Sequence, residues 1–507
     1  MMHHTQIAQR VFNTPLMVDP AKALAFLTGL GPRITGREIS VEGLEVTTED
    51  QATATLPARL LAGLVAGSTA DLRGFALDTH GFGQNRGIWA TFLNSATVNR
   101  QSAPFNIVDM FRMVGASVRS EANQQPRLRL APPPQSALAA ADALLAAVPA
   151  DTAGFVTMQL GASEQRRQWP AEYFAAVGDR LWSERKLCPV LLGSPAERPL
   201  AEAYAQRAQG PFVDAVGKTD LTQLAALLSC SRLLLTNDTG TMHLAAGLGV
   251  TCLAIFLATA QPCDTGPYLP GCCCLEPALP CHPCPFGRPC PNNLACVTHI
   301  QPPTVATLAL AWLDTGRWDT APLELVGREA RVWQTELDAQ DFITVRCLSA
   351  HEAEDRSQWL AQQRIFWRQI LDGLDTSLPA GAGAAVGQAQ PHRKTDPSGS
   401  AGNRFSPAFT QRMYSTLDQA VQLFDILTQQ GQLLGKTPKA GQLFLRNCER
   451  LQSVLDACPE LRSLGAFWRE LRQERGERLD DLLALTTHLA TQLIDWRNKY
   501  ANGTSFA

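Results

Sequence analysis

The 507-residue chain is 45% apolar and 18% charged, so it is long enough to bury two or three hydrophobic cores. Its 44 basic and 47 acidic side chains leave a net charge of -3, a balance that excludes the basic footprint of a nucleic-acid-binding protein. The first residues lack the basic and apolar segments of a secretion signal, and no run of about 18 apolar residues occurs. We therefore expect a cytoplasmic protein without a transmembrane segment.

The apolar pattern first becomes clear at residues 72–78, which predict a strand, followed by a polar loop at 79–86. Residues 106–115 have helical spacing that ends in glycine. Asp78 and His80 would lie at the carboxyl end of the strand, where a base could act on a substrate. A loop cap or a surface pair is the competing interpretation of these two residues.

A second α/β unit begins at residues 155–159, a predicted strand that leads into the small-residue turn 160–163 and the amphipathic helix 171–185. Two more short apolar runs, 189–193 and 212–216, alternate with helical patterns. Such alternation predicts a parallel sheet that is covered by helices on both faces.

The most informative stretch is residues 231–249, a short apolar run, a polar turn and a helical pattern ended by glycine. In an α/β sheet, a turn of this kind lies at the carboxyl edge of the strands. The first free amides of the next helix point outward there, so a sugar diphosphate could bind. As the competing interpretation, Asp238 is only a helix N-cap and His243 only a helix-surface residue.

Fourteen cysteines without a secretion signal indicate thiols or metal ligands and not a disulfide framework. Four of them, Cys281, Cys284, Cys290 and Cys296, are interspersed with prolines that prevent regular structure. Four thiolates can surround one ion tetrahedrally, and both zinc and iron accept that geometry. A [4Fe-4S] cluster stays open, and reduced buried thiols are the alternative without metal.

The order of these motifs resembles glycosyltransferase family 9, the bacterial heptosyltransferases. Residues 238–245 read Asp-Thr-Gly-x-x-His-Leu-Ala, Thr-Gly-Pro follows at 265–267, and Gly-Ala-Ser precedes Arg-x-Trp-Pro within 161–170. The resemblance covers about residues 71–313 and is strong over 155–303. It implies an inverting transfer of a heptose-like sugar from a nucleotide diphosphate sugar, of the ADP-heptose type, to a lipopolysaccharide or protein hydroxyl.

The resemblance also implies an α/β fold of the GT-B type, in which two Rossmann-like domains face a cleft. Beyond it, apolar stripes at helical spacing predict a C-terminal all-α domain that packs or self-associates into a homo-oligomer. The expected units are 1–140, an acceptor-side Rossmann-like domain with a degenerate start; 150–320, the nucleotide-sugar-binding domain with the cysteine-rich loop 263–296; 321–377, a hairpin and helix extension; 378–404, a flexible linker; and 405–507, a helical bundle.

Individual roles follow from the resemblance. Arg167 stands where the family has a lysine that contacts the donor diphosphate, which keeps the charge but exchanges a point donor for a planar fork. Glu197 matches the acidic residue that binds the donor ribose hydroxyls, although a first-turn glutamate also complements a helix dipole. The predicted donor-binding residues are Ser163, Arg167, Trp169, Glu197, Lys218, Asp238, Thr239, Gly240 and His243.

The family's base is an aspartate in an N-terminal Gly-Asp loop, but Pro32 stands at the nearest matching position here. Asp78 and His80 are therefore the substitute candidates. A catalytically silent GT-B scaffold, which binds partners through its helical domain, is the alternative function. Relatives that modify autotransporters hold iron through cysteines, which favours iron over zinc as the structural metal. The resemblance leaves open a peripheral position at the inner membrane.

Overall fold

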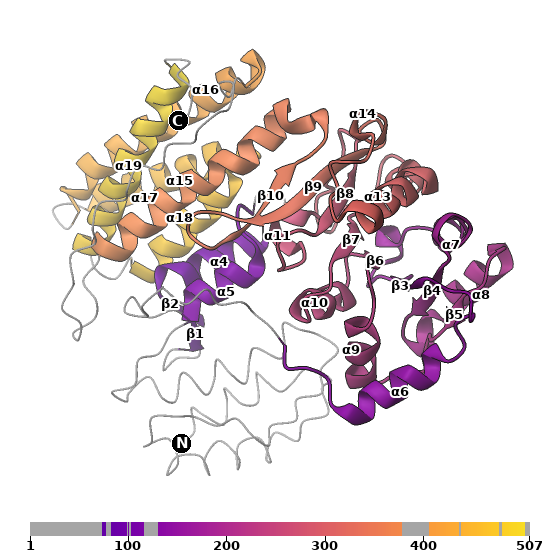
Figure 1. Cartoon of the computed structure of the whole chain (residues 1–507). Coiled ribbons are helices and arrows are strands. Elements are labelled where there is room, and N and C mark those ends of the chain that lie inside the picture. The colour runs from indigo at the N-terminus through magenta and orange to yellow at the C-terminus, as the bar shows by residue number, and fades with distance from the viewer. Residues whose placement is uncertain are drawn as a thin grey trace, which may run out of the picture.

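The structure is a computed structural model. It describes residues 74–77, 83–98, 100, 103–115, 130–377, 405–434, 438–475 and 479–501. An α/β part and a helical part lie side by side (Figure 1). The predicted α/β class with a C-terminal helical domain is confirmed for these residues.

The α/β part is built on one eight-stranded sheet with the order β10-β9-β8-β7-β6-β3-β4-β5. Pairing is parallel from β8 to β5, and β9 and β10 add an antiparallel hairpin at the other edge. The six parallel strands are short and buried, as expected for strands covered on both faces. The strands are β3 (Gly154–Gln159), β4 (Leu187–Leu192), β5 (Val213–Asp214), β6 (Leu234–Asn237), β7 (Cys252–Ile255), β8 (Cys273–Pro277), β9 (Ala330–Leu337) and β10 (Ile343–Cys347).

Helices cover both faces of the sheet, as the sequence predicts. Apolar residues of α7 and α13 share one core with one side of the strands, and α6, α9 and α10 share another core with the opposite side (Figure 1). The helices and 3₁₀ turns of this part are α6 (Gln135–Leu145), η2 (Gln165–Arg167), α7 (Ala171–Arg185), η3 (Pro195–Glu197), α8 (Arg198–Arg207), α9 (Leu221–Ser229), α10 (Gly240–Gly247), α11 (Pro262–Thr265), α12 (Cys296–His299), α13 (Pro302–Thr315) and α14 (Leu323–Val326).

The chain order reverses between β3 and β6. The chain runs outward from β3 to β4 and β5 on one side, then returns to β6 on the other side. The two neighbours end together, since Gln159 pairs with Thr236. In an open α/β sheet this reversal leaves a crevice beyond the carboxyl ends of the strands.

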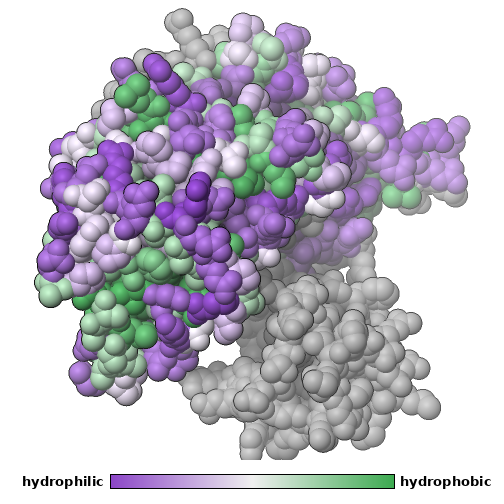
Figure 2. Space-filling view, turned by 90° about the vertical axis from the view of Figure 1, so that its right-hand side faces the viewer, coloured by the Kyte–Doolittle hydropathy of each residue, from purple (hydrophilic) through white to green (hydrophobic). Residues whose placement is uncertain are grey.

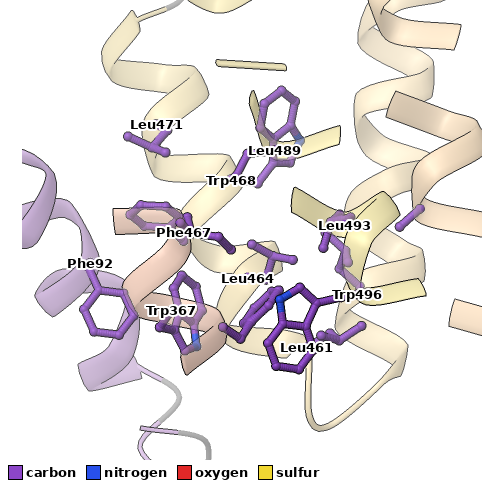
Figure 3. Packing of buried hydrophobic residues seen from close by; sticks show 14 of the residues in the cluster. Phe92, Trp367, Leu461, Leu464, Phe467, Trp468, Leu471, Leu489, Leu493 and Trp496 are labelled. Atoms are coloured by element: carbon purple, nitrogen blue, oxygen red, sulfur yellow. The ribbon is translucent and has the colours of Figure 1, made fainter. Parts of the chain in front are cut away.

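The helical part surrounds a separate core rich in aromatic rings. It contains α15 (Asp355–Ser377), α16 (Pro407–Gly431), α17 (Pro438–Ala457), α18 (Arg462–Arg475) and α19 (Leu479–Ala501). Two helices from far earlier in the chain, α4 (Ile88–Val98) and α5 (Ile107–Gly115), share this core. Figure 3 shows Phe92 of α4 beside Trp367, with ring centroids 4.6 Å apart. Residues expected in the acceptor-side domain thus pack on the C-terminal helices, and the domain boundaries stay a prediction.

One expectation near the start of the chain is wrong. Residues 83–86 were expected in a polar loop, but β2 (Gly83–Arg86) pairs antiparallel with β1 (Gly74–Leu77) in a two-stranded sheet. Backbone hydrogen bonds make this hairpin, and the polar side chains of β2 give no alternating apolar pattern that could reveal it. Within the described ranges, no helix combines the length and apolarity needed to cross a membrane.

Candidate functional site

A cavity of about 390 Å³ lies at the crevice between β3 and β6. Its volume falls in the range of about 300 to 1,000 Å³ that small-molecule sites occupy. Its polar lining includes Ser163, Glu197 and the turn 239–241. Its apolar lining includes Leu221, Leu224 and Leu244. The cavity can therefore accept a molecule with one charged or hydroxylated part and one flat apolar part.

The N-terminus of α10 lies at this cavity, which Thr239, Gly240 and Thr241 line. Thr239 is its N-cap, but the Thr239 side chain accepts no hydrogen bond from the helix. The Thr239 hydroxyl is also buried without a hydrogen-bond partner in the described part of the chain. The first amides of a helix have no partner inside the helix, so these amides and the unused hydroxyl form a corner that could bind an anion. The interpretation of Asp238 as a mere N-cap is wrong, since Thr239 holds that position.

Arg167 lies beside this corner and faces Asp238. Its Nη2 donates to the Asp238 carboxylate, and its Nη1 donates to the Ser163 hydroxyl at 3.2 Å. The Nε atom of Arg167 is buried and unpartnered among the described residues. The guanidinium is thus held in place and keeps one donor unused. An incoming anion would replace Asp238 as the partner of the Arg167 guanidinium. It would also accept a hydrogen bond from the free Nε of Arg167.

Trp169 fixes the turn that carries Arg167. Its indole Nε1 donates to the Ile300 carbonyl at 2.9 Å, and the side chain is 1% exposed. Its backbone N–H donates to Asn237 Oδ1 at 2.9 Å, and Asn237 Nδ2 donates to the Leu160 carbonyl at 2.8 Å. Trp169 therefore packs inside the protein and does not line the cavity. Its predicted contact with a donor stays a prediction.

Glu197 lines the cavity opposite α10. Its Oε2 accepts from the Ser194 N–H at 2.6 Å, as part of a capping box that starts η3. The glutamate therefore does complement a helix start, and it also faces the cavity. Gly161 makes this possible, because a Cβ at that position would lie 1.4 Å from Glu197 Oε1.

The predicted residues Arg167 and Asp238 lie beside the cavity and do not line it, and neither do Lys218 and His243. Lys218 is exposed, and its Nζ donates to the Asp214 carbonyl at 2.7 Å. His243 is half-buried on α10, where burial lowers its pKa although Asp238 opposes the shift. The His243 imidazole is therefore neutral at pH 7. Asp78 and His80 lie outside the residues that the structure describes.

Sequence reasoning missed Asp264, a buried carboxylate in α11. Arg100 Nε donates to its Oδ2 at 2.8 Å. Burial raises the pKa of Asp264 to about 6, Arg100 opposes the shift, and the negative charge of Asp238 adds to it. The Arg100 guanidinium also lies over the Phe286 ring, 5.1 Å from its centroid. Arg100 is 164 positions away from Asp264. No local motif could have revealed the pair.

The cysteine group lies close to this region. The Cys284 N–H donates to the Ala258 carbonyl at 2.8 Å, just beyond β7. The N–H groups of Asn292 and Leu294 both donate to Cys290 Sγ at 3.4 Å. Burial raises the pKa of Cys284, and the thiols of Cys296 and its neighbours add to the shift. Nevertheless, within the described residues, no three His, Cys, Asp or Glu side chains are grouped so that they could hold a metal ion.

Comparison with known proteins agrees with the motifs. The sequence profile of glycosyltransferase family 9 (heptosyltransferase) matches residues 78–295. Lipooligosaccharide heptosyltransferase 2 of Haemophilus ducreyi is 31% identical over 86 residues, which cover 16% of this chain and 24% of that protein. The chain thus matches about a quarter of the length of this relative.

Solved structures give weaker matches. A glycosyl transferase family 9 protein from Veillonella parvula is 24% identical, with a TM-score of 0.28, over 32% of this chain and 45% of that one. The E. coli ADP-heptose lps heptosyltransferase II is 22% identical, with a TM-score of 0.23, over 25% of this chain and 40% of that one. Residues 78–295 of this chain are thus similar to glycosyltransferase family 9.

Proposed function

We propose that this protein is a glycosyltransferase that uses a nucleotide diphosphate sugar of the ADP-heptose type and transfers the sugar, with inversion, to a lipopolysaccharide or protein hydroxyl. The observation that carries the proposal is the open N-terminus of α10 beside Arg167, with Glu197 on the same cavity. The corner suits a diphosphate, and the carboxylate suits a ribose. The wall of Leu221, Leu224 and Leu244 suits a nucleobase.

The proposed chemistry is a single displacement. The acceptor oxygen bonds to the anomeric carbon as the bond to the diphosphate oxygen breaks, and the electron pair leaves with the diphosphate. The acceptor proton passes to a base, for which Asp78 and His80 stay the proposed candidates. Arg167 and the amides of α10 would stabilise the charge that develops on the leaving group, and fixed donors contribute most at that point of a reaction.

Release of ADP from ADP-heptose tests this proposal. A charge-assisted hydrogen bond contributes about 1.5 to 3 kcal/mol, so Arg167→Ala should lower the donor-dependent rate about 10 to 150-fold. Arg317→Ala is the matched control, because among the described residues the Arg317 side chain forms an ion pair only with Asp319, and that pair is exposed. A loss of less than twofold in Arg167→Ala would remove Arg167 from the site.

A catalytically silent scaffold is the second candidate, favoured by Pro32 at the position of the family's aspartate. Donor binding without turnover, with lipopolysaccharide and protein acceptors alike, would support the scaffold. The proposed location is the cytoplasm, at the face of the inner membrane, and the C-terminal helices are the proposed surface of self-association. Gel filtration of the purified protein tests the latter, and a monomer at all concentrations would contradict it.

We also propose that the cysteine group holds a structural metal ion, iron before zinc. The two backbone N–H groups on Cys290 Sγ support this, since such donors stabilise bound thiolates. The described side chains do not form a complete ligand set, so the fit is partial. Metal analysis should find about one ion per chain in the wild type and less in Cys284→Ser. Equal content in both proteins would exclude Cys284 as a ligand.

A further inference from the structure

A row of three hydrogen-bonded side chains crosses the cavity wall. Thr241 Oγ1 donates to Gln159 Oε1 at 3.0 Å, and Gln159 Nε2 donates to Glu197 Oε1 at 3.2 Å. All three residues line the cavity, and Gln159 is 5% exposed. Gln159 is the last residue of β3, Thr241 lies in the first turn of α10, and Glu197 ends η3. The row therefore connects the anion corner with the carboxylate across the cavity.

The row has a defined direction. Because the Gln159 amide oxygen accepts from Thr241, its amide nitrogen faces Glu197. The other carboxylate oxygen of Glu197 accepts from the Ser194 N–H. In the described part of the chain, each oxygen of Glu197 therefore accepts one hydrogen bond, and a carboxylate oxygen can accept more than one. The remaining acceptor capacity of Oε1 is available to a ligand in the cavity.

Glu197 has little freedom to move from this arrangement. Its side chain fills the space that glycine leaves at position 161, and a Cβ at Gly193 would lie 3.2 Å from its Oε2. Removal of Gln159 would therefore leave the carboxylate in a tight slot without one of its two donors. A carboxylate that loses a donor is held less firmly in one orientation, so it is a poorer acceptor for a ligand hydroxyl.

We propose that Gln159 is a positioning residue that holds Glu197 aimed at the ribose hydroxyls, so that the site selects ribonucleoside diphosphates. The inference rests on the proposed donor site and adds the residue that sets its selectivity. Gln159 is neutral, which matters because a second carboxylate at this position would repel Glu197. Thr241 acts one step further away by orienting the Gln159 amide.

Isothermal titration with ADP and with 2′,3′-dideoxyADP tests the inference. In Gln159→Met, which keeps the side-chain length, ADP affinity should fall about 10-fold, while the affinity for the dideoxy compound changes less than about twofold. The preference for ADP should therefore largely disappear. Thr241→Val should change the preference in the same direction by a smaller factor. Gln206→Met is the matched control, since Gln206 is exposed on α8.

A second variant gives a readout that simple loss of packing would not produce. In Gln159→Glu, the introduced carboxyl and Glu197 would share one proton, so ADP affinity should be low at pH 8 and should rise toward pH 5, because a protonated carboxyl can donate as the amide does. Wild-type affinity should not rise in the same way. Thermal melting of each variant shows whether it is folded.

The outcomes separate the two proposals. If the wild type binds neither nucleotide, the proposed donor site is wrong. If the wild type prefers ADP and folded Gln159→Met keeps the same preference, the donor site stands and the role of Gln159 is wrong. A Gln159→Glu variant with the pH dependence of the wild type would also overturn that role.

Discussion

At the scale of single residues, Asp264 gives the clearest dependence on pH. Its pKa lies near 6 in the folded protein against an ordinary value of 3.8, because burial outweighs the attraction of Arg100. Between these two values the folded protein binds more protons at this site than the unfolded chain. The contribution of Asp264 to stability is therefore largest below about pH 4 and is lost as the pH rises through 6.

Asp264→Asn removes this titration. Between pH 4 and pH 7 the free energy of unfolding of the wild type should fall by on the order of 1 to 3 kcal/mol because of Asp264. The variant should not show this decrease. Thermal midpoints at pH 5 and pH 7.5 measure the effect as a difference between the two proteins. Equal shifts of the midpoint in wild type and variant would show that Asp264 titrates at its ordinary value.

The sequence predicted part of the site at this scale. Ser163, Glu197, Thr239 and Gly240 come from three separate segments and do line one cavity, because each follows a strand whose end lies at the same sheet edge. Gln159 and Thr241 belong to no motif, and their bond depends on the positions of β3 and α10. Lys218 carries the expected charge, but its Nζ donates to the Asp214 carbonyl. The spacing of residues in the sequence does not predict the direction of this side chain.

At the scale of elements, one buried ion pair joins the helical part to the sheet. Glu276 of β8 accepts from Arg356 of α15 at 2.8 and 2.9 Å and from the Trp333 indole of β9 at 2.9 Å. The Glu276 side chain is fully buried, whereas that of Arg356 is 24% exposed. The pair fixes the start of α15 on the edge of the parallel sheet.

Removing one partner of this ion pair should lower the stability of the protein more than replacing both partners. Glu276→Gln leaves the Arg356 charge without its partner, and we expect a loss of about 3 kcal/mol, at the low end for buried pairs because Arg356 is partly exposed. Glu276→Gln combined with Arg356→Met should recover most of that loss. Thermal unfolding of both variants measures the difference. A double variant less stable than the single one would contradict this account.

The sequence predicted most elements of the α/β part but not all of their partners. The hairpin of β9 and β10 was expected as part of a small extension, whereas β9 pairs with β8 and lengthens the large sheet. Strand order depends on which edge remains open after folding, and local patterns do not carry that information. The short apolar runs of β3 to β7 were easier to predict from the sequence, because strands buried on both faces are apolar throughout.

At the scale of the whole molecule, segments from both ends of the chain meet in one core. Phe92 of α4 contacts the rings of Trp367 and Phe467, which come from α15 and α18 (Figure 3). Asn94 of α4 also bonds Glu470 of α18. Outside, the face in Figure 2 is mainly hydrophilic with smaller hydrophobic areas between. The helical domain thus supports the early helices and is more than an appended interaction module.

Phe92→Ala tests this shared core. Loss of a fully buried ring costs about 3 to 5 kcal/mol, so the variant should unfold at a clearly lower temperature. Phe111→Ala is the matched control, because Phe111 lies on α5 and is 55% exposed. We expect little change from it. Equal effects of the two substitutions would show that α4 does not pack on the C-terminal helices.

We propose that the corner formed by Arg167, Thr239 and the start of α10 binds the diphosphate of a nucleotide sugar. A crystal structure of the protein with ADP tests it most directly. We expect phosphate density within hydrogen-bond distance of the Arg167 guanidinium and the first amides of α10, with the ribose at Glu197. Nucleotide density elsewhere, with Arg167 still paired with Asp238, would show that this corner does not bind the diphosphate.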